Sequence, residues 1–131
     1  MLGDIIELSV VVKDLEAAIK RFEALFDLKV YQRGESEEFG FKNAILPLGK
    51  GHIELMQPTD PAKAVGRFLE SRGEGVYLVG FDVEEIPEKV RKLRDKGVRV
   101  AQPTPDAPLA WVHPKDAHGL FVELRRPQKY S

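Results

Sequence analysis

The segment VVVKDLEAAIKRFEALFDLKV, residues 10–30, has a similar counterpart in the second half of the chain, FDVEEIPEKVRKLRDKGVRV, residues 81–100. Each begins with the end of an apolar strand and continues into a helix whose apolar residues recur at helical spacing. The two align with one gap near the end of the helix. Farther along, HIELMQP at residues 52–58 aligns with FVELRRP at residues 121–127. Such self-similarity indicates two copies of one structural module.

Each copy predicts the element order β-α-β-β-β. The expected strands cover residues 5–12, 28–33, 41–48 and 52–56 in the first half, and 77–83, 98–102, 109–113 and 120–124 in the second. We expect an acidic turn at residues 35–38 and a short helix that begins at Asp60-Pro61 and ends near Gly73. The predicted fold is therefore α+β, one domain over residues 1–131, with modules at about 4–57 and 76–126 joined by a helical connector, 58–75.

The composition excludes several classes of protein. Twenty basic residues against twenty-one acidic ones give a net charge of −1, which argues against a nucleic-acid-binding protein. The basic end, residues 125–130, is short and is expected to be solvated. No apolar run approaches the ~20 residues of a membrane span, and the N-terminus lacks the features of a signal peptide. The absence of cysteine excludes disulfides and thiolate metal sites. We expect a cytoplasmic protein.

Three glutamates stand in the middle of apolar strands: Glu7, Glu54 and Glu123. A carboxylate in such a place is costly unless it is paired, hydrated or bound to a metal ion. The overlay of the two halves makes Glu54 the counterpart of Glu123, and Glu7 the counterpart of Leu78. The three glutamates are therefore candidate site residues. The alternative, that they lie on the solvated faces of half-exposed strands, stays open.

Several strings indicate a family, among them AILPLGKGHIELMQP (44–58), FLESRGEG (68–75) and WVHPKDAHGLFVEL (111–124). With them the chain resembles the vicinal oxygen chelate superfamily of glyoxalases, bleomycin-resistance proteins and extradiol dioxygenases, and within it the methylmalonyl-CoA epimerases. The resemblance covers nearly the whole chain. It implies that each module forms a curved mixed sheet and that the two sheets form a cup around a divalent metal ion.

The resemblance also implies a ligand set. The family takes one ligand from the first and one from the last strand of each module, and these positions fall on Glu7, Glu54, Leu78 and Glu123. Glu7 and Leu78 stand where the epimerases have histidine, so the expected metal ligands are Glu7, Glu54 and Glu123. The candidate ions are Mg, Mn, Co or Ca, and all-oxygen ligation favours Mg, Mn or Ca over Zn or Ni.

Electrostatics allows two states for three such carboxylates. At ~4 Å and an effective dielectric constant near 20, two of them repel by about 4 kcal/mol, so they cannot all be ionised and unpaired. Either a cation holds them, or at least one is protonated or paired with a base. Lys42 and His52 are the candidate partners in the sequence, and His52 is also a candidate replacement ligand.

The resemblance implies an enzyme that removes and returns a proton beside a carbonyl group and stabilises the enolate with its metal ion. By position, Glu38 and Glu123 are the candidate catalytic bases, and His52, Leu78 and Trp111 are expected to line the cavity. The expected substrate is a small acyl thioester or a 2-oxo acid derivative, turned over by an isomerase or lyase. For Glu38, the alternative of a solvated charge in a turn stays open.

Two other functions remain open. Leu78 makes the cup more apolar, which suits a non-catalytic protein that binds a small organic molecule and has lost its metal site. A regulatory or scaffold protein that uses the fold only for dimerisation is the third hypothesis. In each case we expect a homodimer, by family resemblance, that binds no nucleic acid and no membrane.

Overall fold

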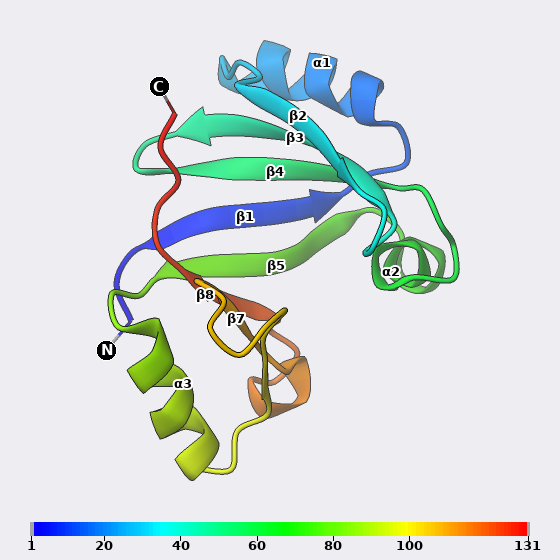
Figure 1. Cartoon of the computed structure of the whole chain (residues 1–131). Coiled ribbons are helices and arrows are strands. Elements are labelled where there is room, and N and C mark those ends of the chain that lie inside the picture. Colours follow the sequence, from blue (N-terminus) through cyan, green and yellow to red (C-terminus); the bar gives the residue numbers. More distant parts are fainter. Residues whose placement is uncertain (1, 131) are drawn as a thin grey trace. The chain divides into compact units, whose positions relative to one another are not determined.

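The computed structural model of the protein describes residues 2–130. Over these residues the chain forms eight strands and three α-helices (Figure 1). The strands are β1 (Ile5–Val11), β2 (Gln32–Ser36), β3 (Phe41–Leu48), β4 (Gly51–Pro58), β5 (Gly75–Asp82), β6 (Val100–Ala101), β7 (Ala110–Val112) and β8 (Val122–Arg125). The helices are α1 (Leu15–Phe26), α2 (Ala64–Arg72) and α3 (Ile86–Asp95), with a 3₁₀ turn, η1, at Pro114–Asp116. The predicted α+β class and the repeated β-α-β-β-β order are confirmed.

The chain divides into two compact units. Unit 1 comprises the residues up to Glu7 together with Leu78–Lys129, and unit 2 comprises Leu8–Tyr77 together with the chain end from Tyr130. The unit boundaries fall inside β1 and β5. These units differ in their bounds from the modules predicted from the sequence. The division into two modules and a helical connector stays a prediction.

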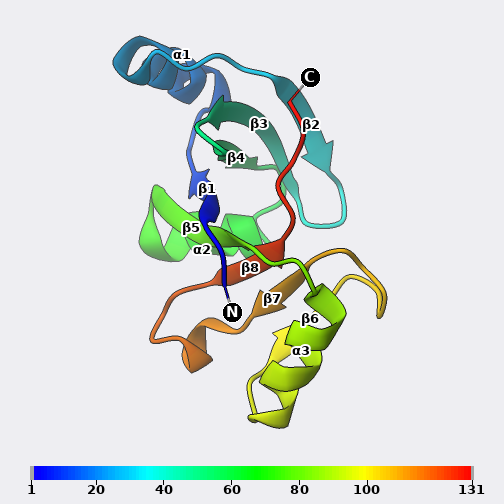
Figure 2. The ribbon, with the colours of Figure 1, turned by 90° about the vertical axis from the view of Figure 1, so that its left-hand side faces the viewer.

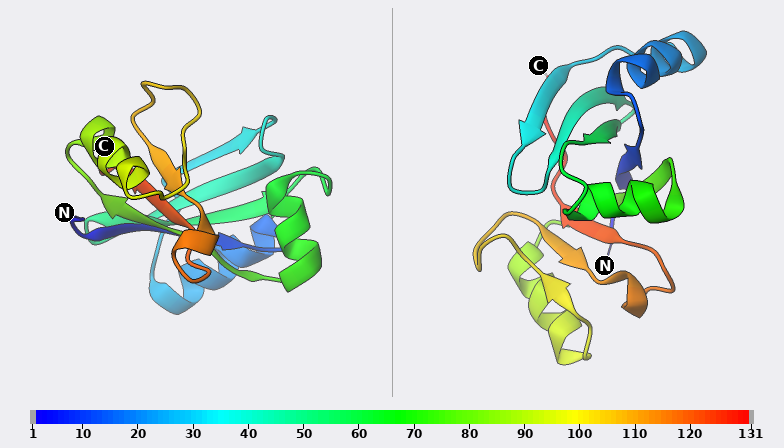
Figure 3. Two further views of the ribbon diagram at one scale, coloured as in Figure 1. Left: turned by 90° about the horizontal axis from the view of Figure 1, so that it is seen from below. Right: turned by 90° about the vertical axis from the view of Figure 1, so that its right-hand side faces the viewer.

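Unit 2 contains the strand order β2-β3-β4-β1, with antiparallel pairing from β2 to β4. Helix α1 begins where the Asp14 side chain accepts a hydrogen bond from the Ala17 amide at 3.1 Å, and it ends at Asp27, whose φ of 59° is left-handed. The helix packs on β3 and β4 (Figure 3). The apolar core between them consists of Val12, Leu15, Ile19, Ala44, Leu46 and Leu55.

Unit 1 contains the strand order β5-β8-β7-β6, in which β5 and β8 are parallel and the other pairs antiparallel. Helix α3 lies beside β6 (Figure 2). The core of this unit consists of Val83, Ile86, Val90, Ala110, Val112, Val122 and Leu124. Because alternate residues of a strand face opposite sides, these core residues of β8 leave Glu123 and Arg125 together on its other face.

Several predicted boundaries are wrong. The connector helix begins at Ala64 and not at Asp60-Pro61, and the strand expected at residues 98–102 covers only Val100–Ala101. The strand expected at residues 28–33 lies at Gln32–Ser36, and the acidic turn is shorter than expected, because Glu35 and Ser36 pair with β3. The apolar residues Leu28 and Val30, which suggested the earlier start, pack against the core of α1 without joining the sheet. Among the described helices, none combines the length and the apolar character needed to cross a membrane.

Candidate functional site

Two buried glutamates and one arginine lie together in unit 1. The Arg125 Nη1 atom is 3.3 Å from Glu7 Oε1 and 3.3 Å from Glu123 Oε2. Only 4% of Glu7 and 7% of Glu123 is exposed to solvent. Glu123 and Arg125 are two residues apart on β8 and so share a face, while Glu7 comes from β1. We call these three residues the carboxylate–arginine cluster.

Gly80 makes room for this cluster. In the parallel β5–β8 ladder Gly80 is the Cα partner of Glu123. A Cβ atom at position 80 would lie 2.7 Å from the Cβ of Glu7 and 2.9 Å from its Oε1, and 3.6 Å from the Cδ of Arg125. These distances leave no space for a side chain. The glycine therefore allows Glu7 to lie beside the β5 backbone.

Trp111 orients the carboxyl group of Glu123. The two residues are Cα partners in the antiparallel β7–β8 pair, and the indole Nε1–H donates a hydrogen bond to Glu123 Oε1 at 2.9 Å. One oxygen of Glu123 thus faces Trp111 and the other faces Arg125. Trp111 also lines a hollow of about 600 Å³ in unit 1, whose other walls include Val98, Val100, Phe121, Arg94 and Arg99.

Burial raises the pKa of Glu123 well above its ordinary range. A side-chain hydrogen bond with Glu7 and the negative charge of Glu7 raise this pKa further, while the Trp111 hydrogen bond and the charge of Arg125 oppose the shift. Burial and the neighbouring Glu7 therefore favour the protonated, neutral form of Glu123. In that form, one guanidinium and one proton together balance the charges of two carboxylates.

The remaining predicted ligand, Glu54, belongs to unit 2. It is half-buried, and neutral groups donate hydrogen bonds to both its oxygens: Ser9 Oγ to Oε1 at 2.8 Å, and Asn43 Nδ2 to Oε2 at 2.6 Å. Ser9 is completely buried. Glu54 is thus a half-buried acceptor with well-formed contacts. The three-carboxylate site stays a prediction.

The other candidates lie in different surroundings. His52, in unit 2, is buried, and its Nδ1 hydrogen-bonds with the Tyr130 hydroxyl while the two rings meet edge to face at 5.7 Å. Glu38 is exposed, in the turn between β2 and β3. Leu78 is buried in β5 and offers no ligating atom. The roles assigned to these residues by sequence stay predictions.

The cluster does not fit a divalent metal ion. An ion bound to both Glu7 and Glu123 would have the Arg125 guanidinium as a near neighbour. At ~4 Å and an effective dielectric constant near 20, two unit positive charges repel by about 4 kcal/mol, and a divalent ion doubles this to about 8 kcal/mol. Within residues 2–130, no group of three or more His, Asp or Glu side chains is arranged to hold a metal ion.

Gly80 and Arg125 were not predicted from the sequence as site residues. The prediction of a solvated basic end at residues 125–130 is wrong for Arg125, which ends β8 and whose side chain is only 22% exposed. It is also wrong for Tyr130, which contacts His52. A signal was present, because an arginine two residues after a strand-centre glutamate lies on the same face of the strand.

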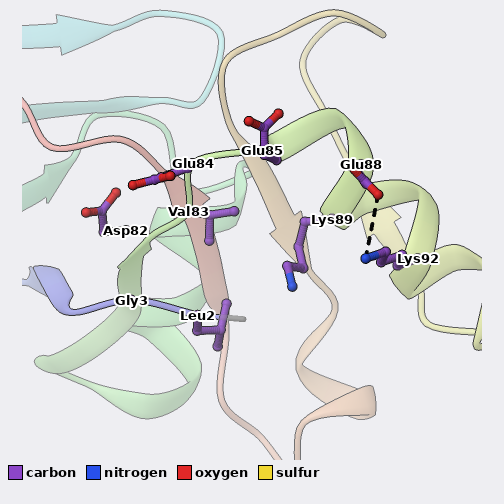
Figure 4. A pocket seen from close by; sticks show the side chains of 9 residues that line it. All are labelled: Leu2, Gly3, Asp82, Val83, Glu84, Glu85, Glu88, Lys89 and Lys92. Atoms are coloured by element: carbon purple, nitrogen blue, oxygen red, sulfur yellow. Dashed lines mark ion pairs between the residues drawn. The ribbon is translucent and has the colours of Figure 1, made fainter.

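A second hollow in unit 1 has a different character (Figure 4). Its volume is about 390 Å³, and four acidic side chains line it together with two lysines and the N-terminal segment: Asp82, Glu84, Glu85, Glu88, Lys89, Lys92, Leu2, Gly3 and Val83. Glu88 and Lys92 form an ion pair across 3.6 Å. The acidic excess makes this hollow a poor site for an anionic ligand, and no predicted site residue lines it.

Comparison with known proteins gives consistent results. The sequence profile of the Glyoxalase/Bleomycin resistance protein/Dioxygenase superfamily matches residues 8–113. The ethylmalonyl-CoA/methylmalonyl-CoA epimerase of Cereibacter sphaeroides is 28% identical over 96% of this chain and 99% of its own length. A variant of Streptomyces coelicolor methylmalonyl-CoA epimerase, solved with 2-nitronate-propionyl-CoA, superimposes with a TM-score of 0.88 and 30% identity, over 95% of this chain and 96% of its own. A methylmalonyl-CoA epimerase solved with methylmalonyl-CoA and NH4+ gives a TM-score of 0.87 at 30% identity, over 95% of this chain and 94% of its own. The predicted glyoxalase-like fold is confirmed.

Proposed function

We propose that the protein is an epimerase-like isomerase of a small acyl-CoA thioester. The premise is that the chain belongs to the Glyoxalase/Bleomycin resistance protein/Dioxygenase superfamily. Relatives similar over nearly the whole chain are methylmalonyl-CoA epimerases, and the two solved structures described above contain methylmalonyl-CoA or 2-nitronate-propionyl-CoA. The geometry of unit 1 supports the reaction class.

The observation that carries the proposal is the buried carboxyl group of Glu123, oriented by Trp111 on one oxygen and by Arg125 on the other. An epimerase breaks the bond between hydrogen and the carbon next to the thioester, and the electron pair moves to the thioester oxygen as an enolate. A proton then returns to the opposite face of the same carbon. A carboxyl group with a raised pKa is suited to carry such a proton.

The hollow beside Trp111 supports the same assignment. Its apolar walls, Val98, Val100 and Phe121, suit an acyl or alkyl chain, and Arg94 adds a cationic donor for an anionic end. Trp111 belongs both to this hollow and to the contacts of Glu123. We therefore assign part of the acyl-CoA to this hollow. Glu38 remains the proposed second proton carrier on sequence grounds.

The test is solvent exchange. The purified protein is incubated in D2O with methylmalonyl-CoA and with a panel of other acyl-CoA thioesters, and deuterium in the acyl group is followed by mass spectrometry. We expect incorporation of deuterium at the carbon next to the thioester. Glu123→Gln should lower the rate by about 10²–10⁴-fold, the usual contribution of a general acid or base. Glu88→Gln, in the exposed face of α3, is the matched control.

One observation favours a second candidate function. Leu78 places a buried apolar side chain at a ligand position of the family, which suits a protein that binds an acyl-CoA without converting it. A ligand-dependent rise in melting temperature without any deuterium incorporation would support this second function over the first. The expected homodimer can be tested separately by sedimentation equilibrium.

A further inference from the structure

We propose that Arg125 replaces the divalent metal ion of this family as the fixed cation of the site, and that the protein functions without a metal. The first half of this statement concerns unit 1 alone. The second half, the role of Arg125 in the reaction, rests on the proposed epimerase function. The two halves are tested by different measurements.

The position of the guanidinium supports the replacement of the metal ion by Arg125. A single nitrogen, Nη1, lies at the same distance, 3.3 Å, from one oxygen of Glu7 and one oxygen of Glu123. These two residues stand at two of the four positions expected to ligate the metal, and Leu78 removes a third ligand. The positive charge of the cluster is therefore supplied by the chain itself. Arginine stays charged over the whole accessible pH range, so this cation is permanent.

The surroundings of Arg125 hold it in place. The side chain is mostly buried, and the Nε–H donates a hydrogen bond to the Arg126 carbonyl at 3.1 Å. The Arg125 stem also lies beside Gly80, since its Cδ is 3.6 Å from where a Cβ of residue 80 would stand, an ordinary van der Waals distance. Moving the guanidinium away to admit a metal ion would leave two buried carboxyl groups without their cation until the ion bound. The arrangement therefore disfavours exchange of arginine for metal.

The second terminal nitrogen, Nη2, supports a role of Arg125 in the reaction. Among the described residues, the hydrogen bonds of Arg125 use Nη1 and Nε, and Nη2 has no protein partner. We assign this N–H group to the oxygen of the substrate thioester, where negative charge develops as the enolate forms. A fixed donor with a full positive charge stabilises such an oxygen without a metal ion. Arg125 would then be a catalytic residue.

The first experiment measures metal binding and needs no activity. The protein is dialysed against EDTA and then titrated with MgCl2, MnCl2, CoCl2 and CaCl2, with calorimetry and the melting temperature as readouts. We expect no stoichiometric binding and no change in the melting temperature. Binding of one ion per chain that is lost in Glu7→Gln or Glu123→Gln would overturn the inference.

The second part of this experiment uses Arg125→Met, which removes the internal cation. We expect this variant to melt at a lower temperature than the wild type and to regain part of the loss when MnCl2 is added. The matched control is Arg126→Met, because Arg126 is the next residue, is half exposed and pairs with Asp82 outside the cluster at 2.7 Å. Arg125→Lys keeps the charge and serves if the Met variant does not fold. A melting temperature of Arg125→Lys equal to that of the wild type would overturn the assignment of the guanidinium as a bridge.

The second experiment measures deuterium exchange into acyl-CoA in the presence of EDTA. We expect the wild-type rate to be the same with EDTA and with added metal ion. Arg125→Lys should lower kcat by about 10-fold or more with a smaller change in KM, since the donor acts on the transition state. Arg126→Met should exchange at the wild-type rate.

The outcomes separate the two proposals. A wild-type exchange rate that EDTA abolishes would overturn the metal replacement and leave the epimerase function standing. An absence of exchange with every acyl-CoA, together with an absence of metal binding, would refute the epimerase function and support the replacement of the metal by Arg125. An unchanged kcat in Arg125→Lys would refute its role as the donor to the enolate oxygen.

Discussion

Gly80 is the residue directly opposite Glu123 in the β5–β8 ladder. Because Gly80 has no side chain, Glu7 can lie beside the β5 strand at this position. The carboxylate–arginine cluster thus depends on a residue that takes no part in its chemistry. Glu7 comes from the start of the chain, whereas Glu123 and Arg125 come from its end. Only the strand register brings them within hydrogen-bonding distance.

Gly80→Ala should destabilise the protein. The new methyl group would lie 2.7 Å from the Cβ of Glu7, so Glu7 or the β5 backbone must move. Such overpacking costs about 1–3 kcal/mol of unfolding free energy, which urea denaturation measures. Gly34→Ala is the matched strand control, because a methyl group there meets only the end of the Asn43 side chain, at 3.1 Å. An equal loss in both variants would contradict the assignment of a special role to Gly80.

Glu123→Gln should make stability less sensitive to pH. The folded state holds the proton of Glu123 at pH values where an unfolded carboxyl, with an ordinary pKa of about 4.3, has lost it. The folded state then binds more protons than the unfolded state, so the wild-type free energy of unfolding falls as pH rises above that value. Glutamine is neutral throughout and removes this term.

The measurement is urea denaturation of the wild type and Glu123→Gln at pH 5, 7 and 9. The free-energy difference between them should shift in favour of the variant as pH rises. Glu88→Gln, whose carboxylate is exposed in α3, serves as the control for the loss of a glutamate. A difference that is the same at all three pH values would show that Glu123 has an ordinary pKa.

Trp111→Phe should lower the free energy of unfolding while keeping an aromatic ring at this position. Phenylalanine retains an aromatic ring but removes the Nε1–H donor that lies 2.9 Å from Glu123 Oε1. A buried oxygen that loses its partner costs about 1–3 kcal/mol of unfolding free energy. Thermal denaturation measures this loss. Trp111→Phe in the Glu123→Met background, where no side-chain oxygen can accept the N–H, should cost less if the hydrogen bond to the carboxyl group is the cause, and an unchanged cost would exclude that cause.

Ser9→Ala should destabilise unit 2 through Glu54. The Ser9 hydroxyl is completely buried and donates to Glu54 Oε1 at 2.8 Å. Without the hydroxyl, Glu54 Oε1 loses a hydrogen-bond donor, which should lower the free energy of unfolding by about 1–3 kcal/mol. The same substitution at the exposed Ser71, whose hydroxyl bonds only backbone carbonyls of its own helix, is the control. Urea denaturation of both variants decides the matter, and equal stabilities would contradict the role of Ser9.

The sequence by itself determined the order of the elements, since the spacing of apolar residues that defines a helix or a strand is a local property. It also singled out Glu7, Glu54 and Glu123, because a carboxylate within an apolar strand is costly wherever that strand lies. It placed β2 too early, because Leu28 and Val30 pack on a helix without joining the sheet, a distinction that apolar character alone does not make.

Only the tertiary structure decided what surrounds each carboxylate. Glu54 receives hydrogen bonds from Ser9 and Asn43, whereas Glu123 lies between Trp111 and Arg125, although the overlay of the two halves makes the two glutamates equivalent. The difference depends on the partner residues that the strand register places opposite each glutamate. Ser9 and Asn43 are 45 and 11 residues from Glu54 along the chain, and Arg125 is 118 residues from Glu7, its other carboxylate partner. Contacts between residues so far apart depend on the pairing of strands, which local sequence patterns do not specify.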